Sequence, residues 1–157
     1  IDLFSAIDAN LKYFDDANDI QTIHPEYHDL IRKNRIAIIA EFMVWLSYFE
    51  TVPKWNPASE GPGVNPKDKA LGLFQMGVLD QGDPWFPGTN YSRSQLLTYG
   101  PNIDMAVKIM AGIAKKKGKI FLRKGQDTGF FWAPILLAGK HDSSNFILDK
   151  CRKFKFD

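Results

Sequence analysis

The feature that most constrains this chain is a long apolar helical stretch that stops at a proline- and glycine-rich segment. Apolar side chains recur at intervals of three and four, the spacing of one face of an α-helix, at Ile36, Ile39, Met43 and Leu46. Further apolar residues nearly surround positions 36 to 49, so we expect this to be the central helix of the core. The helix cannot continue far, because residues 53–69 contain four prolines and two glycines.

The next position on the apolar stripe is occupied by an acid, Glu50. A buried carboxylate is costly unless it is neutral or paired. Apolar neighbours Trp45, Phe49 and Trp55 would desolvate it, and the carboxyl end of a helix disfavours negative charge. We therefore expect a raised pKa and a carboxylic acid that keeps its proton near neutral pH, as cleavage of a glycosidic bond requires. The alternative is a helix-end glutamate that points to water.

The rest of the chain predicts a mainly α (α+β) single domain of 157 residues, with a small loop or hairpin lobe at 53–69 beside a cleft. Asn102 is a good N-cap, because Pro101 precedes it and Asp104 follows in the first turn. Apolar spacing and capping residues predict helices over 2–14, 26–49, 93–99, 102–118, 129–138 and 143–151.

Composition excludes several classes of protein. No apolar run approaches the roughly 20 residues that a membrane-spanning helix needs, so we expect no membrane span. The single cysteine, Cys151, cannot form an internal disulfide, and we interpret it as inert packing. His24 and His28 have helical metal spacing, but Pro25 lies between them, so we interpret them as surface histidines. We predict no metal and no cofactor.

The charge is mild overall but unevenly placed. A net charge of +2 does not argue for a nucleic-acid partner. The basic residues gather in two runs, 115–124 and 150–155. They form either a solvated helix end and tail or a positive face for a polyanionic surface such as a bacterial wall.

A short turn motif, Gly72-Leu73-Phe74-Gln75, follows the proline-rich segment. Gly72 permits a positive φ or a close backbone approach, and Gln75 has both a donor and an acceptor to present. By itself this motif is a weak signal of a functional site. It is a stronger signal when a buried glutamate precedes it in the chain.

With these residues the chain resembles the lysozyme-like superfamily, in particular its soluble lytic transglycosylase and goose-type lysozyme branch. The resemblance covers about residues 40 to 115 and implies a lysozyme-like fold, with a catalytic core over 36–139 and a helical extension over 1–35. Two departures from the family pattern bear on the type of product and on the sugar specificity. The Tyr-Asn pair that usually precedes the Ala-Gly of this region is missing before Ala138-Gly139. The interval from Glu50 to Gly72 is also longer than usual. The matching segments are Glu50-Thr51, Asn56-Pro57, Gly72-Leu73-Phe74-Gln75 and Pro101-Asn102-Ile103.

The resemblance implies roles for particular residues. Glu50 would be the general acid that protonates the leaving oxygen. In hydrolysing relatives an acid of the small lobe helps the attacking water; Asp68 is preferred here, with Glu60 and Asp80 as alternatives. Gln75 would hydrogen-bond the sugar or its acetamido group, and we assign Phe74 and Asn102 to the same substrate-binding set.

Aromatic residues in or beside predicted loops could complete a sugar site, because an exposed ring can stack on a sugar ring. The candidates are Trp85, which is preferred, Phe86, Tyr91, Trp55 and Trp132. The alternative for each is packing within the lobe.

The leading hypothesis is a secreted or periplasmic, monomeric glycosidase that cuts β-1,4 bonds of peptidoglycan or a related amino-sugar polymer. The alternatives are a lytic transglycosylase, which leaves anhydro-sugar ends, and a non-catalytic glycan-binding module of the same fold.

Overall fold

The computed structural model describes residues 2–51, 58, 60–61, 69–77, 89–121 and 142–156, and every structural statement below refers to these residues. They are mainly helical, as expected, and contain no regular strand. The elements, in chain order, are α1 (Leu3–Asp15), the 3₁₀ turns η1 (Ile20–Thr22) and η2 (Tyr27–Asp29), α2 (Arg32–Thr51), α3 (Arg93–Leu96), α4 (Tyr99–Lys117) and α5 (Asp142–Arg152).

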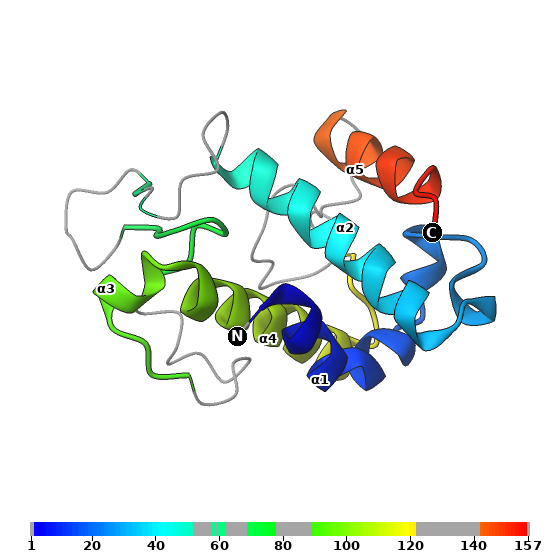
Figure 1. Ribbon diagram of the computed structural model, residues 1–157, viewed down its shortest axis with the longest axis horizontal. Helices are drawn as coiled ribbons and strands as arrows, with labels where there is room; N and C mark the ends of the chain where they lie inside the picture. The colour runs from blue at the N-terminus through cyan, green and yellow to red at the C-terminus, as the bar shows by residue number, and fades with distance from the viewer. Residues whose placement is uncertain are drawn as a thin grey trace.

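Helix α2 lies at the centre of this arrangement (Figure 1). It contacts α1 on one side and α5 on another, and α1 also packs along α4. Of the predicted stripe of α2, Ile39, Met43 and Leu46 are fully buried, whereas Ile36 is only partly buried. The same core continues into the stripes of α1 and α4. The N-terminal segment therefore belongs to the same hydrophobic core, while the expected division at residue 36 stays a prediction. No described helix is both long enough and apolar enough to cross a membrane.

The start of α2 differs from the prediction. The pattern predicted a helix from residue 26, but α2 begins at Arg32, and the turn η2 precedes it. Tyr27 explains the difference, because it is fully buried and its hydroxyl donates to Asp15 Oδ1 of α1 at 2.9 Å. Leu30 then has an extended backbone, with ψ of 143°, which separates η2 from α2. A tertiary contact thus overrides the local helical pattern.

The start of α4 also differs. Asn102 is not its N-cap: the helix begins at Tyr99, Thr98 occupies the cap position, and Pro101 falls in the first turn, where a proline is tolerated. The end agrees with the prediction, because Gly118 terminates α4 with a φ of +66°. The predicted helices at 2–14, 93–99 and 143–151 correspond to α1, α3 and α5. The one predicted at 129–138 lies outside the described residues.

A small antiparallel element follows the range 53–69 expected for the lobe, of which the structure describes residues 58, 60–61 and 69. The backbones of Leu71 and Met76 exchange hydrogen bonds of 2.9 and 2.8 Å, which closes a tight turn over residues 71–76. Glu60 forms a bridge to Leu71, and Gly61 N donates to the Ala70 carbonyl at 2.7 Å. This turn lies against the start of α4, so it brings the Gly-Leu-Phe-Gln motif to the core.

Candidate functional site

The site begins with Glu50, in the last turn of α2. Its side chain is half-buried and has no hydrogen bond or ion pair within the described part of the chain. Burial alone raises the pKa of this carboxyl from 4.5 to about 7, because desolvation disfavours the charged form. The expectation of a raised pKa is confirmed, and a large fraction of the group is protonated at neutral pH.

Two of the three aromatic neighbours predicted to desolvate Glu50 pack against α5. Trp45 and Phe49 both pack edge-on against Phe146 of α5, with ring centroids 5.1 and 5.7 Å apart. Five residues along a helix correspond to about 140° of rotation, so Trp45 leaves α2 on a different side from Glu50. The ring nitrogen of Trp45 donates to Glu41 at 2.6 Å. The third predicted neighbour, Trp55, lies outside the described residues.

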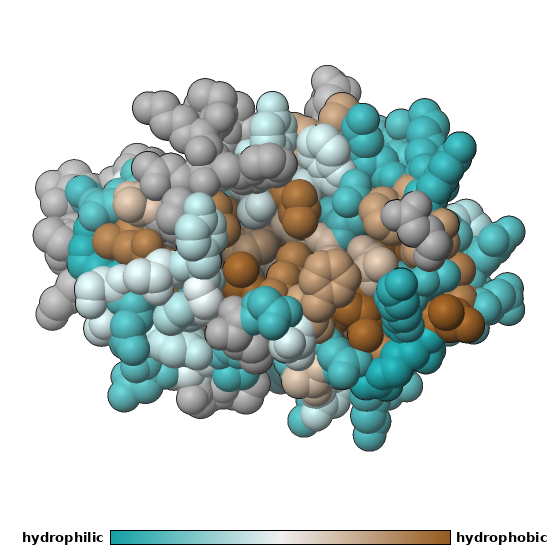
Figure 2. Space-filling view, viewed as in Figure 1, coloured by the Kyte–Doolittle hydropathy of each residue, from teal (hydrophilic) through white to brown (hydrophobic). Residues whose placement is uncertain are grey.

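A hollow of about 290 Å³ lies beside this end of α2. Its described lining combines Val44 and Ser47 of α2, Leu73 of the turn and Tyr99 of α4. Ser47 precedes Glu50 by three residues and therefore lies one turn away on the same side of the helix. The Ser47 hydroxyl donates to the Val44 carbonyl at 2.8 Å, so the walls of the hollow are mostly apolar. Figure 2 shows hydrophobic residues gathered at the middle of the face on which α2 and α4 lie.

The Gly-Leu-Phe-Gln turn requires its glycine. Gly72 has a φ of +73°, and a Cβ there would lie only 2.5 Å from the Leu96 carbonyl oxygen and 2.6 Å from Asn102 Cγ. Both the positive φ and the close approach expected from the sequence are present. Gln75 also has a positive φ, of 50°, and its Nε2 donates to the Gly72 carbonyl at 2.8 Å. That bond uses one amide hydrogen; the predicted hydrogen bond from Gln75 to a sugar stays a prediction.

Asn102 supports this turn from the core. It is fully buried, and its Nδ2 donates to the carbonyls of Leu71 at 3.0 Å and Leu96 at 2.9 Å. Its Oδ1 accepts from the backbone N–H of Phe74 at 3.0 Å. The burial of Asn102 and of Phe74, which is 2% exposed, argues against the predicted direct contact of either side chain with a substrate. The pair instead fixes the turn that places Leu73 in the hollow.

Tyr91 is committed to a polar network. Its hydroxyl donates to Asp104 Oδ2 at 2.6 Å, and the same oxygen pairs with Lys108 Nζ at 2.6 Å. Burial, followed by the hydrogen bond to Asp104 and its charge, raises the pKa of Tyr91 to about 12. The hydroxyl therefore stays protonated and ties the segment before α3 to α4, while stacking of its ring on a sugar stays a prediction.

Of the three candidate second carboxylates, Glu60 is the one that lies among the described residues. It is paired with Lys69 Nζ at 3.1 Å and with Arg93 of α3. Its hydrogen bonds to Arg93 and Lys69 hold the pKa of Glu60 below its usual range. Glu60 is therefore an ionised bridge between the lobe and α3. Asp68, Asp80, Trp85, Phe86 and Trp132 lie outside the described residues.

Sequence reasoning missed Tyr99, Ser47 and Val44 as lining residues. Tyr99 was placed at the end of a short predicted helix, whereas it begins α4 and keeps 57% of its surface exposed. Its position next to Gly100-Pro101 gave a signal for a break in the chain but none for the hollow.

No metal centre emerges among the described histidine, cysteine, aspartate and glutamate residues. His28 is exposed as predicted, but His24 is buried and packs against the Phe156 ring, so its assignment to the surface was wrong. Cys151 is fully buried, and burial raises the pKa of its thiol to about 12, which agrees with inert packing.

Searches of protein-family models, of curated proteins and of solved structures found no match to this chain.

Proposed function

We propose that this protein is a glycosidase that cleaves the β-1,4 bonds of peptidoglycan or a related amino-sugar polymer, with Glu50 as its general acid. The supporting observation is a carboxyl at the end of α2 whose pKa burial raises to about 7 and which has no described ion-pair partner. Such a group can hand a proton to the bridging oxygen of a glycosidic bond near neutral pH.

The neighbouring hollow suits a sugar. Its walls are mostly apolar, and the exposed Tyr99 ring offers a flat surface on which the apolar face of a sugar ring can stack. In this proposal the bound ring next to the scissile bond rests between Tyr99 and α2. Glu50, one turn beyond Ser47, protonates the leaving oxygen.

Hydrolysis and lytic transglycosylation differ in what happens after this proton transfer. Hydrolysis uses a water molecule, helped in many glycosidases by a second carboxylate. Glu60 is engaged by Lys69 and Arg93, and this favours the transglycosylase alternative, in which one acid serves as both acid and base. Asp68 is the second carboxylate that the hydrolase proposal retains.

Digestion of purified peptidoglycan tests the proposal. The wild type is expected to release soluble fragments, and Glu50→Gln, which cannot donate a carboxylic proton, is expected to release almost none. Glu41→Gln is the matched control, since it lies on the same helix and keeps an oxygen to accept from Trp45. Mass spectrometry of the fragments distinguishes reducing ends, which indicate hydrolysis, from anhydro ends, which indicate transglycosylation.

A wild type that binds the polymer but releases no fragment would refute the glycosidase and leave the glycan-binding module. We further propose that the protein acts as a secreted or periplasmic monomer, because its polymer lies outside the cytoplasm.

A further inference from the structure

We propose that the end of the molecule where α4 and α5 terminate beside η1 docks on an anionic phosphodiester polymer of the cell wall. This basic end comprises the lysines and the arginine of the segments 115–119 and 152–155. The choice of a wall polymer as the partner rests on the proposed function, whereas the surface itself does not depend on it.

The charges of the chain are strongly polarised. The chain holds 20 basic and 18 acidic residues, and ten of the basic ones fall in the runs 115–124 and 150–155, which contain no acid. The two runs therefore carry a charge of +10, and the remaining ten basic and eighteen acidic residues carry a net charge of −8. The mild total of +2 thus conceals a positive part that can attract an anion on its own.

The fold brings the two basic runs together at η1. The Asp19 carboxylate accepts hydrogen bonds of 2.7 and 2.8 Å from the backbone N–H groups of residues 120–121, just beyond α4. At the other end of η1, Arg152 Nη2 donates to the Thr22 carbonyl at 3.0 Å. Residues 19–22 span at most about 11 Å even when fully extended, so both runs lie beside the same short segment. No local pattern of either run encodes this juxtaposition.

The helix ends do not by themselves account for this much positive charge. The carboxyl end of a helix carries the equivalent of about half a negative charge, which a single lysine offsets. The last turn of α4 carries three lysines, of which Lys115 and Lys116 are exposed. Lys119 and Lys155 lie beyond the last residues of α4 and α5. An excess of positive charge therefore remains after both helix ends are satisfied.

The described acids around the basic end do not cancel its charge. Asp19 is held by backbone N–H groups, and Asp149 is paired with Lys153 at 2.8 Å. The other acids of the flanking turns are exposed, namely Asp16, Glu26 and Asp29. The basic residues of the segments 115–119 and 152–155 outnumber all of these acids together, so the end keeps a positive field.

The composition of this surface favours a flexible polyanion over a nucleic acid or a membrane. Proteins that bind single strands stack bases on exposed aromatic rings, and membrane-surface binders bury an apolar face. Here the rings of Phe154 and Phe156 pack on each other, and Phe156 also packs on the buried His24. The charges come from helix ends and turns, not from a helix face that could enter the groove of a duplex. Lysines on flexible stems can instead follow closely spaced phosphates.

The position of the basic end leaves the proposed catalytic site open. Figure 1 shows the C-terminus and the end of α4 on the side where α2 starts, and the last turn of α2 on the opposite side. The rise of an α-helix separates Arg32 from Glu50 by about 27 Å. A polymer held at the basic end would therefore not fill the hollow beside Glu50, and docking and cleavage can occur together.

Binding of synthetic poly(glycerol phosphate) to the full chain, measured over a range of salt concentrations, tests the proposal. We expect binding that weakens about tenfold or more between about 50 and 200 mM salt, because counterions are released. Lys115→Gln and Lys155→Gln, one from each run, should each weaken binding by about two- to fourfold and lower the salt slope by about one. Asn90→Asp is the matched control, since it makes the same change of net charge at an exposed position before α3.

The outcomes separate this inference from the proposed function. If peptidoglycan is cleaved but poly(glycerol phosphate) does not bind, or binds both lysine variants as it binds the control, the basic end is refuted and the catalytic proposal stands. If the polymer binds and both lysine variants weaken it while no fragment is released, the basic end stands and the catalytic proposal fails.

Two further probes test the choice of partner. Double-stranded DNA and vesicles of phosphatidylglycerol are compared with poly(glycerol phosphate) at equal salt. Binding to either that is as tight as binding to the polymer would overturn the assignment to a wall polymer. Thermal unfolding establishes that each variant is folded, since all three substituted positions are exposed.

Discussion

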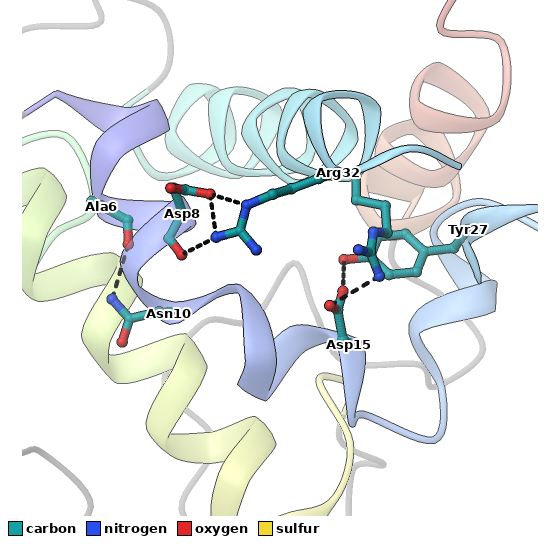
Figure 3. Close-up of polar contacts among 7 residues, drawn as sticks. Ala6, Asp8, Asn10, Asp15, Tyr27 and Arg32 are labelled. Carbon is teal, nitrogen blue, oxygen red and sulfur yellow. Dashed lines mark hydrogen bonds and ion pairs between the residues drawn. The ribbon is translucent and has the colours of Figure 1, made fainter. Parts of the chain in front are cut away.

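The two ends of α2 handle charge in opposite ways. At its start, Arg32 is paired with Asp8 of α1 and Arg35 with Asp15 of α1. Figure 3 shows Arg32 beside Asp8, and Asp15 beside Tyr27. At its end, Glu50 has no described partner, and burial raises its pKa to about 7. The charges at the start join two helices, whereas the acid at the end carries a cost in stability and keeps a transferable proton.

The two ion pairs at the start also differ from each other. The Arg35–Asp15 pair, at 3.0 Å, is about three-quarters buried, and Asp15 also accepts from the hydroxyl of the buried Tyr27. Burial, followed by the charge of Asp15, raises the pKa of Tyr27 well above its ordinary value. The Arg32–Asp8 pair is exposed, so water and salt screen it. The buried Arg35–Asp15 pair should therefore contribute more to the stability of the fold than the exposed Arg32–Asp8 pair.

The largest expected effect concerns Glu50, in the last turn of α2. Glu50→Gln should lower the cleavage rate by roughly 10²- to 10⁴-fold, the usual contribution of a general acid. Because the acid must be protonated, the wild-type rate should fall as the pH rises through about 7. Rates of fragment release between pH 5 and 9 measure both effects. A variant as fast as the wild type would remove Glu50 from the reaction.

The next largest effect concerns Asn102, which supports the turn over residues 71–76. Asn102→Ala should lower the free energy of unfolding by about 2–4 kcal/mol, because it removes three buried hydrogen bonds, to the Phe74 N–H and to the Leu71 and Leu96 carbonyls. Urea unfolding measures the change. Thr98→Ala is the comparison, since the side chain of Thr98 at the cap position is exposed and bonds only locally, to the Gln95 carbonyl. Equal losses for the two variants would contradict the role assigned to Asn102.

The cost of burying Glu50 should be visible in stability. With a pKa of about 7 in the folded state and 4.5 in the unfolded state, the folded protein binds more protons between these values. Stability therefore falls as the pH rises from about 4.5 to 7, and the loss is complete above that window. Glu50→Gln should be more stable than the wild type by roughly 1–3 kcal/mol at pH 8, with the difference shrinking towards pH 4. Chemical unfolding at the two pH values measures this; a constant difference would contradict it.

The smallest effects separate the two ion pairs at the start of α2. Asp15→Asn should cost about 1–2 kcal/mol, because it weakens bonds to both Arg35 and Tyr27. Asp8→Asn should change stability by less than about 0.5 kcal/mol, because its pair is exposed. Thermal unfolding of both variants in low and high salt measures the contrast. A larger loss for Asp8→Asn would reverse the ranking by burial.

The differences between prediction and structure have a common cause. Local patterns predicted the helix that became α1 and the glycine that ends α4, because capping and periodicity act between near neighbours. They misplaced the start of α2 and the role of Asn102, because both depend on partners far along the chain: Asp15 for Tyr27, and Leu71 and Phe74 for Asn102. The raised pKa of Glu50 was predicted correctly, but Trp45, one of the neighbours held responsible, packs on α5.

The sequence by itself determined that a central apolar helix has an acid in its last turn, and that a glycine turn follows the break, because spacing and backbone freedom are local properties. Only the tertiary structure decided which residues form the hollow beside this end of α2. Tyr99, Ser47 and Leu73 line it together although they come from three separate parts of the chain, and no local pattern encodes that arrangement. The pKa of a carboxyl depends on the water it loses, and that loss depends on the folded surroundings of Glu50 rather than on residue spacing.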